Sequence, residues 1–180
     1  MERKKFGSTD MEVSILGFGG AEIGFEGADA ATVERLLGSA LDAGLNMETS
    51  INIADQEAIE LTLPKARERG MGVIAKRPIA NTSWKYDSLP NVEYHQAYWE
   101  RLQKLQYDFL NAPMQEVVST ALRFTLAQPG VCTAIVGTAK PDRWVENATL
   151  VAQGRLPEET VQAIRRRWTE VVGADWIGLE

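Results

Sequence analysis

The sequence is poor in two residues on which many enzymes and extracellular proteins depend, because its 180 residues include one cysteine and one histidine. A single cysteine, Cys132, excludes a disulfide within the chain and suggests a reducing compartment. Cys132 lies in the apolar run VCTAIV, so we expect a buried thiol. A single histidine, His95, excludes a metal site built from several histidines. Its apolar and aromatic neighbours predict a surface or packing role.

Long apolar runs and an excess of positive charge are also missing. No run approaches the roughly 18 residues of a membrane-spanning helix, and the start does not resemble a signal peptide. We therefore expect a cytoplasmic protein with no membrane partner. The net charge of -6 argues against nucleic acid as a partner. The one basic run, residues 165–167, lies beside acidic residues in a helical pattern, which predicts a solvated helix face.

Strands and helices are predicted to alternate along the chain. Residues 1–20 predict a β-hairpin and a first strand, and further strands are predicted over residues 45–53, 72–79 and 132–138. Apolar residues at helical spacing predict helices over residues 31–44, 56–70, 114–128, 142–154 and 157–171. Asp55 is expected to cap the second helix. Residues 80–112 form an insertion with a helix of its own over residues 92–109.

This alternation predicts an α/β fold, with a parallel sheet and helices outside it. The strands are continuous apolar runs, which is typical of parallel strands covered on both faces. No stretch has the composition of a linker, so residues 1–180 are expected to form a single domain.

The strongest motif is IVGTAKPDRWVEN, residues 135–147. A strand is predicted to end at Gly137, and Pro141 suits the first position of the helix that follows. Free N–H groups at the helix start, with Lys140 and Arg143 nearby, favour an anion.

The helix of this motif carries three polar residues on one face. Arg143, Glu146 and Asn147 are spaced at i, i+3 and i+4, so their side chains are neighbours. Such a face suits a planar polar group such as an adenine. The spacing fits equally well an ordinary capped helix whose charges face water.

Three long segments resemble the aldo-keto reductase family, in the order in which that family has them. Residues 4–20 (KKFGSTDMEVSILGFGG) resemble its N-terminal hairpin and first barrel strand. Residues 52–81 (NIADQEAIELTLPKARERGMGVIAKRPIAN) resemble its sixth strand through its seventh. Residues 121–148 (ALRFTLAQPGVCTAIVGTAKPDRWVENA) resemble the helix before strand eight, strand eight and the next helix. The family fold is an eight-stranded β/α barrel.

Residues 44–57 (GLNMETSINIADQE) resemble two different strands of that family. They begin like the second strand and end like the sixth, and the change falls near residues 47–48. The resemblance implies that the central strands are missing and that four parallel βα units remain: one, a two/six hybrid, seven and eight. We therefore expect a partial (half) TIM-type β/α barrel with an N-terminal β-hairpin and a C-terminal helix.

The resemblance implies that reductase activity is lost. The family reduces carbonyls with NADPH through a Tyr just after strand two, supported by an Asp at the end of strand two, a Lys on strand three and a His on strand four. Strands three and four are absent here. Glu48 stands near the Asp position, and the next tyrosine is Tyr86. No catalytic residue is carried over. One alternative is an NADP-dependent carbonyl oxidoreductase assembled in a homodimer, with Glu48 or Tyr86 as a replacement acid. The other is a structural module without a cofactor.

The cofactor site implied by the resemblance is better preserved. Its six residues lie on the loop and helix after strand eight: Gly137, Thr138, Lys140, Arg143, Glu146 and Asn147. Thr138 and Arg143 match positions that hold the 2'-phosphate side of NADPH. Glu146 and Asn147 match positions that hold the adenine. Lys76 and Arg77, after strand seven, are placed to contact pyrophosphate. Weak, partial NADP(H) binding is therefore expected.

Four parallel strands cannot close as eight do, so such a sheet exposes two edges and an apolar face. Two copies supply eight strands, and we predict a homodimer with paired edges or swapped elements. An open monomer covered by the hairpin or the insertion is the alternative. Candidates for the interface or the cover are the aromatic residues of the insertion: Trp84, Tyr94, Tyr98, Trp99, Tyr107 and Phe109.

Overall fold

A computed structural model of the chain describes residues 2–5, 10–15, 31–32, 35, 38–39, 42, 46–140 and 142–179. The predicted N-terminal hairpin is confirmed: β1 (Arg3–Lys5) pairs antiparallel with β2 (Glu12–Ser14), with Arg3 opposite Ser14. The predicted first strand, from residue 16 on, and most of the predicted helix over residues 31–44 lie outside the described residues, as does Pro141.

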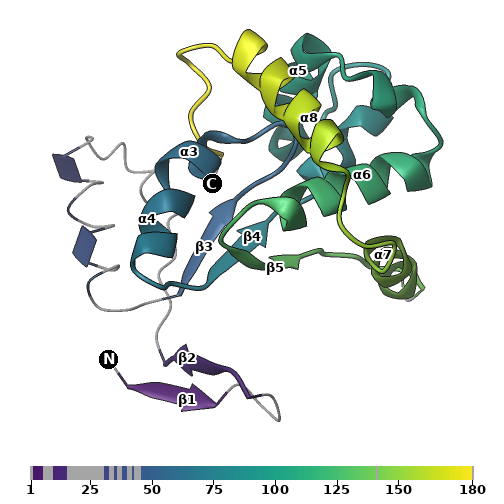
Figure 1. Ribbon diagram of the computed structural model, residues 1–180. Helices are drawn as coiled ribbons and strands as arrows, with labels where there is room; N and C mark the ends of the chain where they lie inside the picture. The colour runs from purple at the N-terminus through teal and green to yellow at the C-terminus, as the bar shows by residue number, and fades with distance from the viewer. Residues whose placement is uncertain are drawn as a thin grey trace.

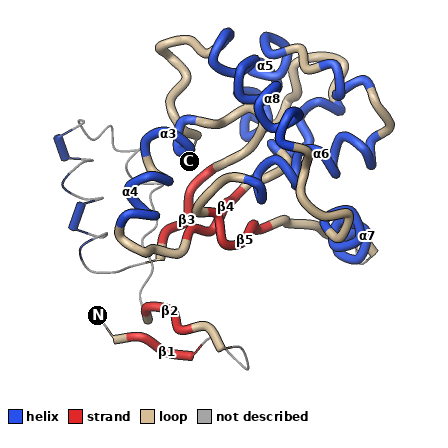
Figure 2. The backbone as a smooth tube through the Cα atoms, in the orientation of Figure 1, coloured by secondary structure: helices blue, strands red, loops and turns tan. Residues whose placement is uncertain are grey.

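The centre of the structure is a parallel sheet in the order β3 (Met47–Ser50), β4 (Val73–Lys76), β5 (Val131–Ile135) (Figure 2). Met47 lies opposite Val73, and Val73 lies opposite Val131. These strands confirm the parallel arrangement expected for the last three βα units. Among the described strands, β4 is paired on both sides, whereas β3 and β5 are each paired on one side.

Two short helices connect β3 to β4, where the sequence predicted one. They are α3 (Glu57–Leu61) and α4 (Leu63–Glu68), separated at Thr62. Pro64 lies in the first turn of α4, where its missing N–H costs no hydrogen bond; inside one long helix it would break the ladder. The prediction of an uninterrupted helix over residues 56–70 was therefore wrong.

The remaining helices surround one end of the sheet (Figure 1). The insertion forms η1 (Ala80–Lys85), α5 (Glu93–Leu105) and η2 (Asp108–Asn111). After it come α6 (Met114–Ala127), α7 (Arg143–Val151) and α8 (Glu158–Val171). α5 packs against α8, while α6 packs against β5 and α7. No helix in the described part of the chain is long and apolar enough to cross a membrane.

Two clusters of buried side chains form the core. The larger joins α5, α6 and α8 and includes Tyr98, Tyr107, Phe124 and Trp168. The smaller lies between the sheet and α3–α4 and includes Leu63 and other aliphatic side chains. Tyr98 and Tyr107 of the insertion are therefore core residues of this chain, and neither is exposed to form an interface.

The two faces of the sheet are covered differently. Met47, Thr49, Val73 and Ala75 are buried, whereas Glu48, Ile74 and Lys76, which alternate with them, are half-buried. On β5, Cys132 is exposed, so the prediction of a buried thiol was wrong. An apolar run identifies a strand, but β5 ends the described sheet and lacks cover there.

Candidate functional site

The loop between β5 and α7 is organised by short hydrogen bonds of its own. The N–H of Lys140 donates to Oγ1 of Thr138 at 3.1 Å, and the N–H of Arg143 donates to the carbonyl of Lys140 at 3.1 Å. Gly137, Thr138 and Lys140 are exposed, and a Cβ added at Gly137 would meet no atom within 4 Å. The loop is therefore open to an incoming ligand.

Arg143 and Glu146 lie together on α7, as their spacing predicted. Nη1 of Arg143 lies 2.9 Å from Oε2 of Glu146, and the side chains are 36% and 43% exposed. A guanidinium has five N–H donors, so Arg143 keeps donors for another anion. The carboxylate holds Arg143 in place and also reduces the charge that a phosphate would meet.

Asn147 is buried, unlike the other predicted cofactor residues. Its side chain belongs to the wall of a groove between β5, α6 and α7 with a volume of about 380 Å³. Apolar side chains, including Leu122, Val136 and Trp144, form most of the other walls. The amide is thus a polar group in an apolar groove next to the open loop.

This groove was not predicted from the sequence. Its α7 side consists of Trp144, Asn147, Ala148 and Val151, and its other side comes from α6 and β5. The spacing of Trp144, Ala148 and Val151 at i, i+4 and i+7 marks a second helix face beside the polar one. That spacing is the feature of the sequence from which the α7 wall of the groove could have been predicted.

Glu48 of β3 and Lys76, the last residue of β4, form an ion pair, with Oε1 and Nζ 3.9 Å apart. Tyr86 lies after η1, where its ring meets the imidazole of His95 edge to face at a centroid distance of 5.6 Å. The two candidate replacement acids are therefore engaged in separate contacts.

Arg77, expected near pyrophosphate, instead holds the C-terminal segment, residues 173–179. Its Nε donates to the hydroxyl of Tyr94 at 2.6 Å, and its Nη1 donates to the carbonyl of Leu179 at 3.0 Å. Burial alone would lower the pKa of Arg77, but the hydroxyls of Tyr98 and Tyr94 outweigh it and raise that pKa. Arg77 thus stabilises the fold at this end of β4.

Asp55 also contacts the C-terminal segment. Its Oδ2 accepts the N–H of Leu179 at 2.9 Å, while Gln56 is the N-cap residue of α3 and no side chain caps that helix. The prediction of Asp55 as a helix cap was therefore wrong, because a distant segment takes its carboxylate. The C-terminal segment thus lies at the loops that follow β3 and β4, where barrel enzymes bind their substrates.

A buried hydroxyl pair lies at the same end of β3. Oγ of Ser50 and the hydroxyl of Tyr98 are 3.1 Å apart. Burial raises the pKa of Tyr98, and the nearby carboxylate of Asp55 raises it further. The phenol therefore stays protonated and packed, which is typical of a core tyrosine.

Comparisons with known proteins agree with the expected family. A sequence model of the Aldo/keto reductase family matches residues 21–168. Among curated proteins, none matches the chain. Among solved structures, the apo form of the aldo-keto reductase AKR11C1 from Bacillus halodurans has a TM-score of 0.61 at 22% sequence identity, covering 78% of this chain and 50% of that one.

Two further structures show the same partial overlap. The holo form of AKR11C1 has a TM-score of 0.58 at 22% identity, with 78% of this chain and 49% of that chain covered. The glycerol dehydrogenase AKR11B4 from Gluconobacter oxydans has a TM-score of 0.59 at 16% identity, with 89% and 56% covered. The chain spans about half the length of these structures, and its three parallel strands correspond to part of their barrel. Since the family match extends over most of its length, the chain belongs to the aldo-keto reductase family.

Proposed function

We propose that the chain binds NADP(H) weakly, through the adenosine half of the cofactor, and does not reduce carbonyls. The observation that carries this proposal is the groove between β5, α6 and α7, which lies next to the loop of Lys140 and Arg143. Its volume of about 380 Å³ falls within the range of small-molecule pockets, about 300–1,000 Å³.

The chemistry of the groove suits an adenine. Its apolar walls favour a flat aromatic base, and the ring of Trp144 offers a surface for stacking. The amide of Asn147 can both donate and accept hydrogen bonds at the edge of that base. Outside the groove, the start of α7 and the side chains of Lys140 and Arg143 favour the 2'-phosphate.

The contacts at the carboxyl end of the sheet support the absence of reductase activity. A carbonyl substrate would need space beside the ends of β3 and β4, where Asp55 and Arg77 hold the C-terminal segment. It would also need a proton donor there. Glu48 pairs with Lys76 and Tyr86 packs against His95, which argues against the alternative of a reductase with one of these acids.

Calorimetric titration with NADPH tests the proposal. We expect saturable binding that Arg143→Ala weakens at least about tenfold, since a charged hydrogen bond contributes about 1.5–3 kcal/mol. NADH, which lacks the 2'-phosphate, should bind more weakly, and Asn147→Leu should weaken both cofactors. The control Arg166→Ala removes an exposed guanidinium from α8 and should leave binding unchanged.

The other functions predict different results. A structural module without a cofactor would give no heat at millimolar NADPH. An oxidoreductase would consume NADPH when aldehydes are added to the protein, and the absorbance of NADPH would measure this consumption. We expect binding without consumption.

We propose in addition that a second copy covers the open face of the sheet. On that face Ile74 is half-buried and Ile135 is exposed. The related barrels are about twice as long as this chain, so a second copy would supply a comparable number of strands. Burial of the aliphatic side chains favours such a homodimer.

A further inference from the structure

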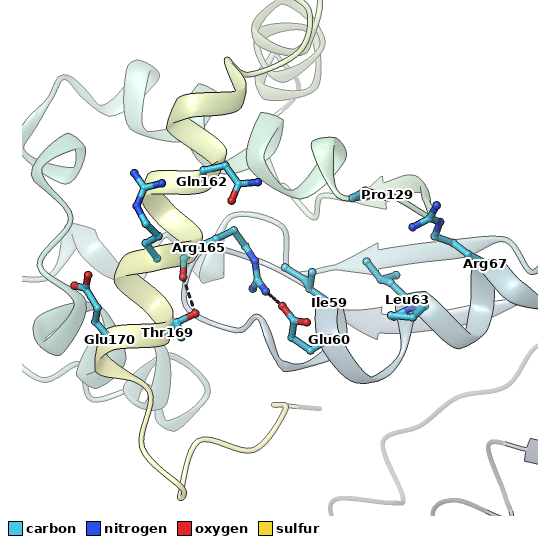
Figure 3. Close-up of a pocket in the computed structure, with 11 residues that line it drawn as sticks. Ile59, Glu60, Leu63, Arg67, Pro129, Gln162, Arg165, Thr169 and Glu170 are labelled. Atoms are coloured by element: carbon cyan, nitrogen blue, oxygen red, sulfur yellow. Dashed lines mark hydrogen bonds and ion pairs between the residues drawn. The ribbon is translucent and has the colours of Figure 1, made fainter.

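A second groove lies between α3–α4 and α8 and has a volume of about 590 Å³ (Figure 3). It shares no lining residue with the groove beside α7. Its apolar residues are Ile59, Leu63, Pro64 and Pro129, which come from α3, α4 and the turn before β5. A ligand bound here would therefore meet an apolar surface between helices that are far apart in the sequence.

Three arginines line this groove, and two of them are held in place. Nη1 of Arg165 donates to Oε1 of Gln56 at 2.7 Å, and Arg165 also pairs with Glu60. The aliphatic part of Arg67 lies against Gly130, where an added Cβ would come within 2.8 Å of Cγ of Arg67. Figure 3 shows Arg67 and Pro129 on the side of the groove opposite α8.

The charges of the lining do not cancel. It contains three arginines and two glutamates, in a protein whose net charge is -6. Glu60 is paired with Arg165, and Glu170 lies 3.5 Å from Arg167, which is not part of the lining. Within the described part of the chain, Arg67 and Arg166 have no ion pair, so both guanidiniums are available to an anion.

We propose that this groove binds a small organic anion, a monocarboxylate with a flat apolar body. A guanidinium binds a carboxylate with two parallel hydrogen bonds, and the aliphatic and proline side chains would take the apolar body. The carboxylates of Glu60 and Glu170 oppose ligands with several negative charges, such as polyphosphates. Together, the arginines, the glutamates and the apolar residues favour a ligand that has a single negative charge and an apolar body.

Titration of the full chain with phenylacetate, followed by amide chemical shifts, tests the proposal. We expect saturable shifts at residues of α3, α4 and α8. Phenylacetamide has the same shape without the charge and should bind at least about tenfold more weakly, because it loses the charged hydrogen bonds. Inorganic phosphate has the charge without the apolar body and should also bind more weakly.

Variants locate the site. The double variant Arg67→Ala, Arg166→Ala should weaken phenylacetate about tenfold or more, since both guanidiniums are lost. Lys65→Ala, an exposed residue of α4 outside the lining, should leave binding unchanged. Circular dichroism checks that each variant is folded, and retained NADPH binding by the double variant would separate the two grooves.

Three outcomes would overturn the proposal. They are no saturable shifts with phenylacetate, equal binding of phenylacetate and its amide, and phosphate binding as tight as that of phenylacetate. Unchanged affinity in a folded double variant would place the ligand elsewhere.

Discussion

The guanidinium of Arg101 lies 3.7 Å from the carboxylate of Asp55, and the side chains are only 7% and 1% exposed. Nη2 of Arg101 also donates to the carbonyl of Ile177 at 2.6 Å, and the guanidinium lies 5.2 Å from the ring centroid of Trp176. With Asp55 accepting the N–H of Leu179, the pair joins α5 and the loop after β3 to the C-terminal segment.

We expect Arg101→Met to destabilise the fold by about 3–5 kcal/mol, because it leaves the carboxylate of Asp55 buried without its countercharge. The free energy of unfolding in urea measures this loss. The matched control is Lys4→Met, which breaks an exposed pair with Glu2 at 4.0 Å and should cost less than about 1 kcal/mol. A similar cost for the two variants would contradict the structural role of the buried pair.

Tyr107 predicts a loss of stability at alkaline pH. Its hydroxyl donates to the carbonyl of Ile53 at 2.9 Å and accepts from Nε2 of Gln56 at 3.3 Å. Burial raises the pKa of Tyr107 well above the value of about 10 in the unfolded chain. Above a pH of about 10, the tyrosine loses its proton in the unfolded state but keeps it in the folded state, so the free energy of unfolding falls as pH rises.

The slope of this fall approaches about 1.4 kcal/mol per pH unit for each such tyrosine. Burial also raises the pKa of Tyr98, so Tyr107→Phe should reduce the alkaline slope without abolishing it. Urea unfolding from pH about 8 to about 11 measures both slopes. Identical slopes would show that Tyr107 ionises equally in the two states.

For His95 we expect the opposite dependence, a loss of stability as pH falls in the acidic range. Burial, and then the charge of Lys85, lower the pKa of His95 from its ordinary value of 6.5. Its ring also lies between those of Tyr86 and Tyr94. The unfolded state therefore takes up a proton first, and the stability present above pH 6.5 is lost as pH falls through the folded pKa.

The titration of His95 can be followed by NMR, because the single histidine of the chain gives one set of imidazole signals. We expect their titration midpoint below 6.5 and a rise of that midpoint in Lys85→Gln. A midpoint at or above the ordinary value would mean that the ring is solvated. A midpoint unmoved in Lys85→Gln would assign the whole shift to burial.

The elements that the sequence predicted well are those with local patterns. The hairpin, the three later strands and the helices α6 and α8 follow from alternation, helical spacing and the turns that bound them. The contact between Arg143 and Glu146 is also local, since its residues are three positions apart.

The features that the sequence did not predict depend on distant segments. Asp55 binds the N–H of Leu179, 124 residues away, and Arg165 binds Glu60, 105 residues away. An apolar run predicted that Cys132 lies on a strand, but its exposure depends on what covers that strand. Both grooves lie between elements from separate parts of the chain, and local spacing marks at most one wall of a groove, as it does on α7.

The proposed homodimer leads to the last prediction. Ile135 is 50% exposed on the open face of the sheet, and it lies opposite Lys76 of β4. If a second copy covers this face, Ile135→Lys places a charge in an apolar contact and should dissociate the dimer. Light scattering during size-exclusion chromatography should give twice the chain mass of 19.9 kDa for the wild type and the single mass for the variant.

The matched control is Val145→Lys, because Val145 is 64% exposed on α7, outside the open face of the sheet. It adds the same charge at a site that is at least as accessible, so it should leave the dimer intact. A monomeric wild type at high protein concentration would refute the dimer. Dissociation by Val145→Lys with a stable dimer in Ile135→Lys would move the interface to α7, where it would compete with the proposed NADP(H) groove.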